Sequence, residues 1–183
     1  MNANPIQTLK PNVSREEALR SFSAAKFSRV YWRLTKGPLR RLADIYVPFS
    51  FYTVRYQMGK GRLRRVFAAD AVNGSLDLFE FPRLPEGGQF LDILTRNVIP
   101  VSLPESRAGD LLRDKVLRLI FQQGFFRLRD PQLEITREPA STHIPYWVGF
   151  YGSTFVKCRA LDAVRRRFEG AKASAFFEEW LAA

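Results

Sequence analysis

The chain has 183 residues, of which 46% are hydrophobic and 14% aromatic, so it holds enough apolar material for one or two compact domains and is neither wholly disordered nor fibrous. One Cys excludes a disulfide framework or a Cys-based zinc cluster, and one His excludes any site that needs two histidines. The formal net charge of +11 favours an acidic partner. No stretch approaches the roughly 20 apolar residues of a membrane span, and residues 1–10 lack the apolar core of a signal peptide, so we expect a soluble, cytoplasmic protein.

The first predicted element is a helix that begins at Ser14. Ser14 and Glu17 have the spacing of a capping box, in which each side chain satisfies a free backbone amide at the helix start. Apolar residues then recur at three- and four-residue steps as far as Leu34, and Gly37-Pro38 ends the helix.

Strands are predicted to follow this helix. Residues 46–56 are rich in aromatic and β-branched side chains, and Gly59-Lys60-Gly61 is a turn signal that leads into a second strand over residues 63–69. Asn73-Gly74 indicates another tight turn, after which residues 76–81 form a short strand.

The second half of the chain repeats this order. A helix capped by Asp110 carries an apolar stripe and ends at Gly124, and two strands are expected over residues 144–151 and 154–161. A final helix follows Gly170. Its expected apolar face consists of Phe176, Phe177, Trp180 and Leu181.

Short matched segments indicate that the chain contains an internal repeat. The recurring pairs are Val47-Pro48-Phe49 with Ile144-Pro145-Tyr146, Asp70-Ala71-Val72 with Asp162-Ala163-Val164, and Trp32-Arg33-Leu34 with Phe126-Arg127-Leu128. The expected fold class is α+β: two similar copies, each a long helix packed on a small antiparallel sheet, with a C-terminal helix. The expected division is a tail (1–13), a first copy (14–81), a Pro- and Gly-containing linker (82–106) and a second copy (107–183). Whether Pro48 and Pro145 are cis or trans is left open by the sequence.

Residues 53–81 resemble the β-portion of the PepSY domain family. That family has a helix followed by an antiparallel hairpin and an Asp-Ala-x-x-Gly turn, which Asp70-Ala71-Val72-Asn73-Gly74 matches. The second copy has Arg165-Arg166 in place of Asn-Gly, so it matches in part. The resemblance implies a non-catalytic module associated with the inhibition or regulation of peptidases, often outside the cytoplasm. The chain also resembles bacterial proteins of unassigned function.

Four side chains invite a catalytic interpretation, and each also has a structural one. His143 occupies the repeat position of Tyr46, which favours a half-exposed strand residue over a general base. Cys158 takes the position of Val66, which favours a small apolar role over a nucleophile. Asp70 and Asp162 form a paired acid site if they meet, but an Asp at a strand end also accepts hydrogen bonds from the turn that follows.

The basic residues raise the possibility of an anion-binding surface. Candidate contacts with an anionic partner are Arg40, Arg41, Arg62, Arg64, Arg65, Arg165, Arg166 and Arg167. Arginines interleaved with aromatic residues are able to bind single-stranded RNA or DNA by phosphate contacts and stacking, but no named nucleic-acid motif is present.

The sequence therefore favours a non-enzymatic binding or scaffold protein with a basic first half. We expect no catalytic residue, cofactor or metal, and a protein or other acidic partner, for example a segment added at a sheet edge. Single-stranded nucleic-acid binding is the alternative, and an enzyme without a recognisable motif is a second alternative. The partner and the oligomeric state are not encoded in any recognisable pattern.

Overall fold

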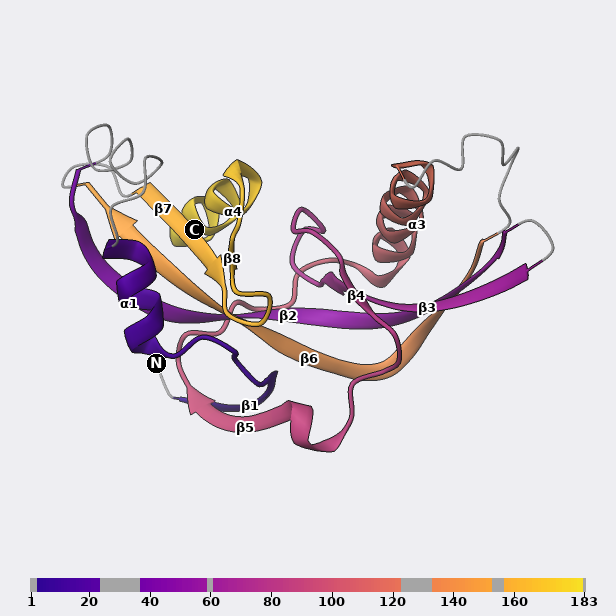
Figure 1. Ribbon diagram of the computed structural model, residues 1–183, viewed down its shortest axis with the longest axis horizontal. Helices are drawn as coiled ribbons and strands as arrows, with labels where there is room; N and C mark the ends of the chain where they lie inside the picture. Colours follow the sequence, from indigo (N-terminus) through magenta and orange to yellow (C-terminus); the bar gives the residue numbers. More distant parts are fainter. Residues whose placement is uncertain (1–2, 24–36, 59–60, 123–132, 153–156, 183) are drawn as a thin grey trace. The chain divides into compact units, whose positions relative to one another are not determined.

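The computed structural model describes residues 3–23, 37–58, 61–122, 133–152 and 157–182 (Figure 1). The elements follow in the order β1 (Asn4–Leu9), α1 (Arg15–Ser23), β2 (Leu39–Met58), β3 (Gly61–Asp70), β4 (Phe79–Phe81), a 3-10 turn η1 (Gly87–Gln89), β5 (Phe90–Thr95), α3 (Glu105–Gln122), β6 (Leu133–Tyr151), β7 (Lys157–Asp162), β8 (Arg167–Phe168) and α4 (Ala171–Ala182). None of the helices in these ranges is long and apolar enough to cross a membrane.

The strands are hydrogen-bonded in the order β4–β3–β2–β6–β1–β5, and β7 joins both β6 and β8 outside this path. The predicted fold class, two similar copies that each pack a long helix on a small antiparallel sheet, is wrong, because strands of both halves belong to one eight-stranded mixed sheet. The physical reason is the length of two strands: β2 has 20 residues and β6 has 19, and they are neighbours, so they hydrogen-bond to each other instead of closing separate sheets.

The chain divides into two compact units, and β2 and β6 contribute residues to both. The α1–α4 unit comprises residues 1–47, 89–99 and 143–183, and the α3 unit comprises residues 48–88 and 100–142. Each unit therefore combines residues from both of the predicted copies, 14–81 and 107–183.

Helix α1 begins as predicted. The Ser14 amide donates to Glu17 Oε2 at 2.8 Å, and the Glu17 amide donates to Ser14 Oγ at 3.2 Å, which confirms the capping box. The predicted continuation of this helix to Leu34 lies outside the described residues.

In the α1–α4 unit, α1 packs against β6 and β7. Ala18 and Phe22 are buried in one cluster with Tyr151 and Leu161. The helix of the first predicted copy thus contacts the hairpin of the second, and this pairing is a further reason why the predicted fold class fails.

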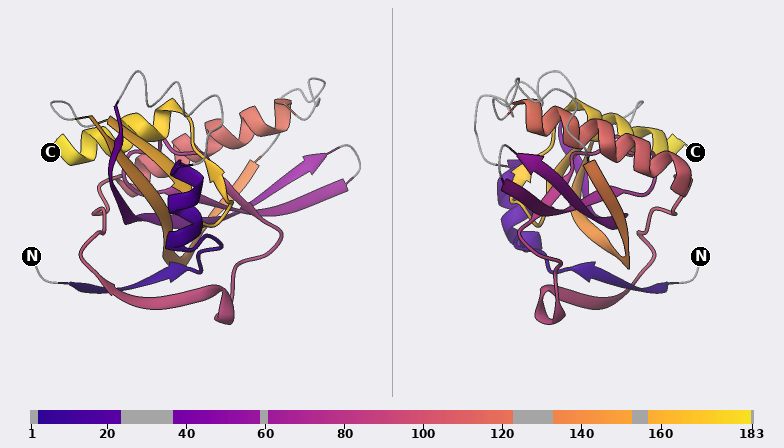
Figure 2. Two further views of the ribbon diagram at one scale, coloured as in Figure 1. Left: turned by 60° about the vertical axis from the view of Figure 1, so that its left-hand side comes forward. Right: turned by 90° about the vertical axis from the view of Figure 1, so that its right-hand side faces the viewer.

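Helix α4 follows Gly170, as predicted, and covers the opposite face of β6 and β7 (Figure 2). Its Phe177 ring lies 5.5 Å from that of Tyr146, whose side chain points away from the face that holds Tyr151, because side chains alternate along a strand. Leu181, expected on the buried face, is 45% exposed.

Strands β1 and β5 form an antiparallel pair in the α1–α4 unit. Their register runs from Asn4 opposite Thr95 to Leu9 opposite Phe90, and β1 joins β6 through a parallel bridge between Thr8 and His143. The predicted tail thus contains β1, and the predicted linker contains β5 and the start of α3.

In the α3 unit, the hairpin β2–β3 is covered by α3. The buried stripe Leu112, Val116 and Ile120 packs with Tyr52 and Phe67, which confirms the apolar pattern read from the sequence.

The predicted cap at Asp110 is wrong, because α3 already begins at Glu105. The amides of Arg107 and Ala108 donate to the Pro104 carbonyl at 3.1 and 3.0 Å, so Pro104 closes the first turn. Nothing in residues 105–109 opposes a helix strongly enough to delay its start.

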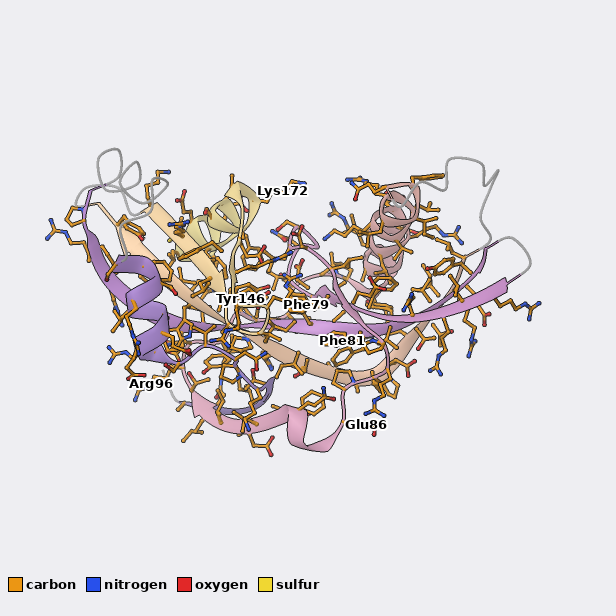
Figure 3. All side chains as sticks on the ribbon, in the orientation of Figure 1. Phe79, Phe81, Glu86, Arg96, Tyr146 and Lys172 are labelled. Atoms are coloured by element: carbon orange, nitrogen blue, oxygen red, sulfur yellow. The ribbon has the colours of Figure 1, made fainter. Side chains whose placement is uncertain are left out.

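Four phenylalanines of β2 and β4 pack together on the face of the β2–β3–β4 strands opposite α3. The rings of Phe49 and Phe79 are 5.4 Å apart, those of Phe51 and Phe81 are 5.8 Å apart, and Phe79 stacks with Phe81 at 6.2 Å (Figure 3). Phe49, Phe51, Tyr52 and Val54 are each at most 4% exposed, so this part of β2 is buried on both faces.

The close packing of α1 on β6 at Gly149 predicts that a methyl group added there lowers the stability of the protein. A Cβ at Gly149 would lie 2.5 Å from the Phe22 ring and 2.9 Å from Leu39 Cδ1. We expect Gly149→Ala to lower the free energy of unfolding by about 1–3 kcal/mol, since it overpacks a filled site. Urea denaturation measures the change.

The matched control is Gly109→Ala in α3, where a Cβ meets no atom within 4 Å. There the same substitution should raise the unfolding free energy by about 0.5–1 kcal/mol, because Ala favours the helix. A Gly149→Ala protein as stable as the parent contradicts this packing of α1.

Candidate functional site

The Asp70 carboxylate is enclosed by backbone amides of the turn that follows β3. Its Oδ1 accepts hydrogen bonds from Val72 (3.3 Å), Asn73 (3.1 Å) and Gly74 (2.8 Å), and its Oδ2 accepts one from Leu76 (2.9 Å). The residue is 1% exposed. These four donors explain the burial of a charge without any catalytic role.

Asp162 has the matching place at the end of β7. Its Oδ1 accepts from the amides of Val164 and Arg165, each at 2.8 Å, and its Oδ2 pairs with the Arg165 guanidinium. That guanidinium also donates to Glu169 at 3.0 Å. Both Asp residues therefore cap turns, in agreement with the structural interpretation of the sequence.

The two turns also share a left-handed residue. Gly74 has φ +71° and Arg166, four residues after its own Asp, has φ +58°. Glycine adopts this conformation freely, whereas arginine does so at a cost of about 1–2 kcal/mol. The Arg166 side chain forms an ion pair with Glu17 of α1 at 2.9 Å, so in this unit the turn is tied to the helix.

The predicted cluster Arg165–Arg167 is largely neutralised within the α1–α4 unit. Arg165 pairs with Asp162 and Glu169, Arg166 with Glu17, and Arg167 with Glu169 at 3.4 Å. Burial and the Asp162 carboxylate act in opposite directions on the pKa of Arg165, with a net rise, so this side chain stays charged. These arginines serve to hold the turn, which leaves less charge for a partner.

The cluster on β3 is partly neutralised as well. Arg65 pairs with Glu80 of β4 at 3.4 Å, and Arg64 contacts Thr53 Oγ1 at 3.5 Å. The Thr53 hydroxyl donates to Glu138 of β6 at 2.5 Å, which places a carboxylate near Arg64.

At the same face, Arg55 of β2 pairs with Glu134 of β6 at 2.9 Å, although both side chains are more than half exposed. The β2–β3 register sets Arg55 opposite Arg64 and Gln57 opposite Arg62. Arg62 is exposed and has no ion pair among the residues that the structure describes. Arg64 likewise has no ion pair with a described residue, so Arg62 and Arg64 both keep an unneutralised charge.

Arg40 and Arg41 lie near the start of β2 in the α1–α4 unit, and both are exposed. Arg41 borders a pocket of about 510 Å³ that is also lined by Phe150, Glu178, Leu181 and Ala182. The residues that line the pocket belong to β2, β6 and α4, and they combine one guanidinium with apolar side chains.

Glu178 in this pocket is already engaged. Its Oε1 accepts the Cys158 amide at 2.9 Å and its Oε2 accepts from Lys157 Nζ at 3.0 Å. Arg41 forms no ion pair with any described residue. The pocket therefore presents one cation that an incoming carboxylate or phosphate could neutralise.

The contacts of His143 and the burial of Cys158 indicate structural roles for both residues. Nδ1 of His143 lies 3.1 Å from the Gln7 carbonyl and its own carbonyl accepts from Thr8 Oγ1 at 3.0 Å, so the residue joins β6 to β1. Burial lowers the pKa of His143, against the effect of the Gln7 contact. Cys158 is fully buried.

Sequence reasoning proposed the arginines but missed the acidic residues that meet them. Glu80, Glu134 and Glu138 carry no motif, and the arrangement of the strands brings them beside Arg65, Arg55 and Thr53. Glu169 lies only four residues after Arg165 and also carries no motif. Leu181 was expected on the apolar face of the last helix, and its exposure beside Arg41 could not be foreseen from periodicity. No group of three or more potential metal ligands occurs within the described ranges.

Comparisons with family models, curated proteins and solved structures found no match. The resemblance to PepSY domains thus stays a prediction.

The surroundings of Cys158 predict its reactivity. Burial, with a contribution from Glu178, raises the pKa of the thiol to about 12. At pH 8 the reactive thiolate is therefore scarce, and we expect 5,5′-dithiobis(2-nitrobenzoate) to label the folded protein at least ~100-fold more slowly than the urea-unfolded chain. Equal rates for the two states contradict a buried structural thiol.

Proposed function

We propose that the protein is a non-enzymatic binding protein whose α1–α4 unit receives a partner segment bearing an acidic group next to an apolar side chain. The observation that carries this proposal is the pocket in which Arg41 adjoins Phe150, Leu181 and Ala182. Its volume of about 510 Å³ lies within the roughly 300–1,000 Å³ typical of ligand pockets.

The chemistry of the pocket defines the ligand class. A guanidinium binds a carboxylate or phosphate by charge-assisted hydrogen bonds, and the adjoining apolar wall, including the 45% exposed Leu181, gains from the burial of an apolar group. An acidic peptide segment with a neighbouring Leu or Phe supplies both features. The pairing of Glu178 with Lys157 leaves Arg41 to select for the anion.

Support for a non-enzymatic role comes from the side chains that the sequence offered for catalysis. Asp70 and Asp162 bind turn amides, His143 joins two strands, and Cys158 is buried with a raised pKa. A single buried thiol suits a reducing compartment, so we place the binding reaction in the cytoplasm.

The ion pairs of the predicted arginines favour a protein partner over single-stranded nucleic acid. Phosphate binding needs cations that are not already neutralised, and Arg65, Arg165, Arg166 and Arg167 each have a carboxylate partner.

A fragment titration followed by ¹⁵N NMR tests the proposal. The probe is 4-phenylbutanoate, and its neutral amide is the matched ligand control. We expect the carboxylate to shift the amide signals of Phe150, Leu181 and Ala182 and the amide to bind more weakly. Arg41→Gln should weaken carboxylate binding about fivefold, as expected for loss of an exposed ion pair worth ~1 kcal/mol, whereas Arg40→Gln should not.

Two results would overturn the proposal. One is the absence of shifts at the pocket, or equal affinity of the parent and the Arg41→Gln protein for the carboxylate. The other is tight binding of a dT20 oligonucleotide that falls steeply with salt and depends on Arg62 and Arg64, which would support the nucleic-acid alternative instead.

A further inference from the structure

Strand β5 is an open edge of the sheet. It ends the hydrogen-bonded order and pairs on one side with β1, and no described strand lies on its other side. Figures 1 and 2 both show β5 outside β1. The backbone amides and carbonyls on that outer side are therefore able to pair with another strand.

The edge also lacks most of the usual protection against such pairing. Proteins guard open edges with proline, lysine or a bulge, but the sequence of β5, Phe90–Thr95, contains neither proline nor lysine, and its pairing with β1 is regular over all six residues. Leu94 is 70% exposed and Leu91 is 38% exposed. An exposed apolar edge of this kind is a site for strand addition.

Symmetry restricts how β5 could pair with itself. Two identical antiparallel strands in one continuous sheet are related by a two-fold axis perpendicular to the sheet, so residues that face each other must lie on the same face. The axis then passes midway between the two copies of one residue of β5, which face each other. The registers centred on Asp92, Ile93 and Leu94 are the ones to compare.

The charges on β5 favour one of these registers. Centring on Asp92 opposes two carboxylates, which is destabilising, and centring on Ile93 sets Asp92 opposite a leucine. Centring on Leu94 sets Asp92 opposite Arg96 of the other copy, twice by symmetry, and brings the two Leu94 side chains together. Asp92 and Arg96 are both exposed, and Arg96 directly follows the C-terminal end of β5 (Figure 3).

From this self-complementarity we infer that β5 pairs antiparallel with β5 of a second copy of the chain, with Asp92 opposite Arg96 on each side of a central Leu94 pair. The inference is independent of the Arg41 pocket and goes beyond the proposed function. In this register residues 92–96 of each copy are paired, and so short an edge buries less than the roughly 1,200–2,000 Å² of stable interfaces, so the dimer forms at high micromolar concentrations.

Sedimentation velocity over about 10 µM to 1 mM measures the monomer–dimer equilibrium. We expect Asp92→Arg and Arg96→Asp each to weaken the dimer at least about tenfold, because each opposes like charges at two symmetric positions. The double variant Asp92→Arg/Arg96→Asp restores opposite charges and should return the dissociation constant to within about threefold of the parent. Leu94→Asp should abolish the dimer.

Glu179→Arg is the control for a change of net charge, since Glu179 is exposed on α4, and it should leave the dimer unchanged. Recovery in the double variant shows that the two reversals compensate each other, as expected if the single variants lose affinity through opposed like charges. The inference is overturned by a parent protein that stays monomeric at 1 mM, by a dimer insensitive to both reversals, or by a double variant as weak as the single ones.

Discussion

In each unit a buried carboxylate fixes the backbone where a long hairpin ends, and the placement of the helices depends on it. The carboxylates of Asp70 and Asp162 accept hydrogen bonds from backbone amides of the turn that follows each strand. The next residue, Ala71 or Ala163, donates its amide to the carbonyl of Pro48 at 2.9 Å or of Pro145 at 3.1 Å. The Ala71 carbonyl accepts the amides of residues 102 and 103, just before α3, and the Ala163 carbonyl accepts that of residue 12, just before α1. Each turn is thus hydrogen-bonded to the segment that leads into a helix of its own unit.

Local features of the sequence predicted local structure well. The Ser14–Glu17 capping box, the apolar stripe of α3 and the helix after Gly170 are all present, because each depends on residues close together in the chain. The sequence left the isomers of Pro48 and Pro145 open, and no cis peptide bond occurs in the described part of the chain. The fold class was wrong for a different reason. An apolar stripe shows which face a helix buries but not which hairpin it covers, and Phe22 packs against the hairpin of the other half.

In the candidate site, too, features set by neighbouring residues could be predicted, and features set by contacts between distant residues could not. Clusters of arginine are visible in the sequence, but several of their carboxylate partners come from distant parts of the chain, through strand pairing or through the packing of α1. Glu134 lies 79 residues from Arg55, and Glu17 lies 149 residues from Arg166. β6 itself extends over polar residues 133–143, whose charged side chains gave no strand signal. Arg41 lines a pocket with Phe150, Leu181 and Ala182, residues of β6 and α4 that only the fold brings beside the start of β2.

Amide hydrogen exchange in the parent and in an Asp70→Asn variant tests the central role of the carboxylate most directly. In the parent, the turn amides of Gly74 and Leu76 should exchange as slowly as core amides of β3, because Asp70 holds them. In the variant, these amides and that of Leu103 should lose at least about tenfold of their protection, while the amide of Val164 in the Asp162 turn stays protected. Fast exchange of Gly74 and Leu76 in the parent, or an unchanged Leu103 in the variant, would contradict the account.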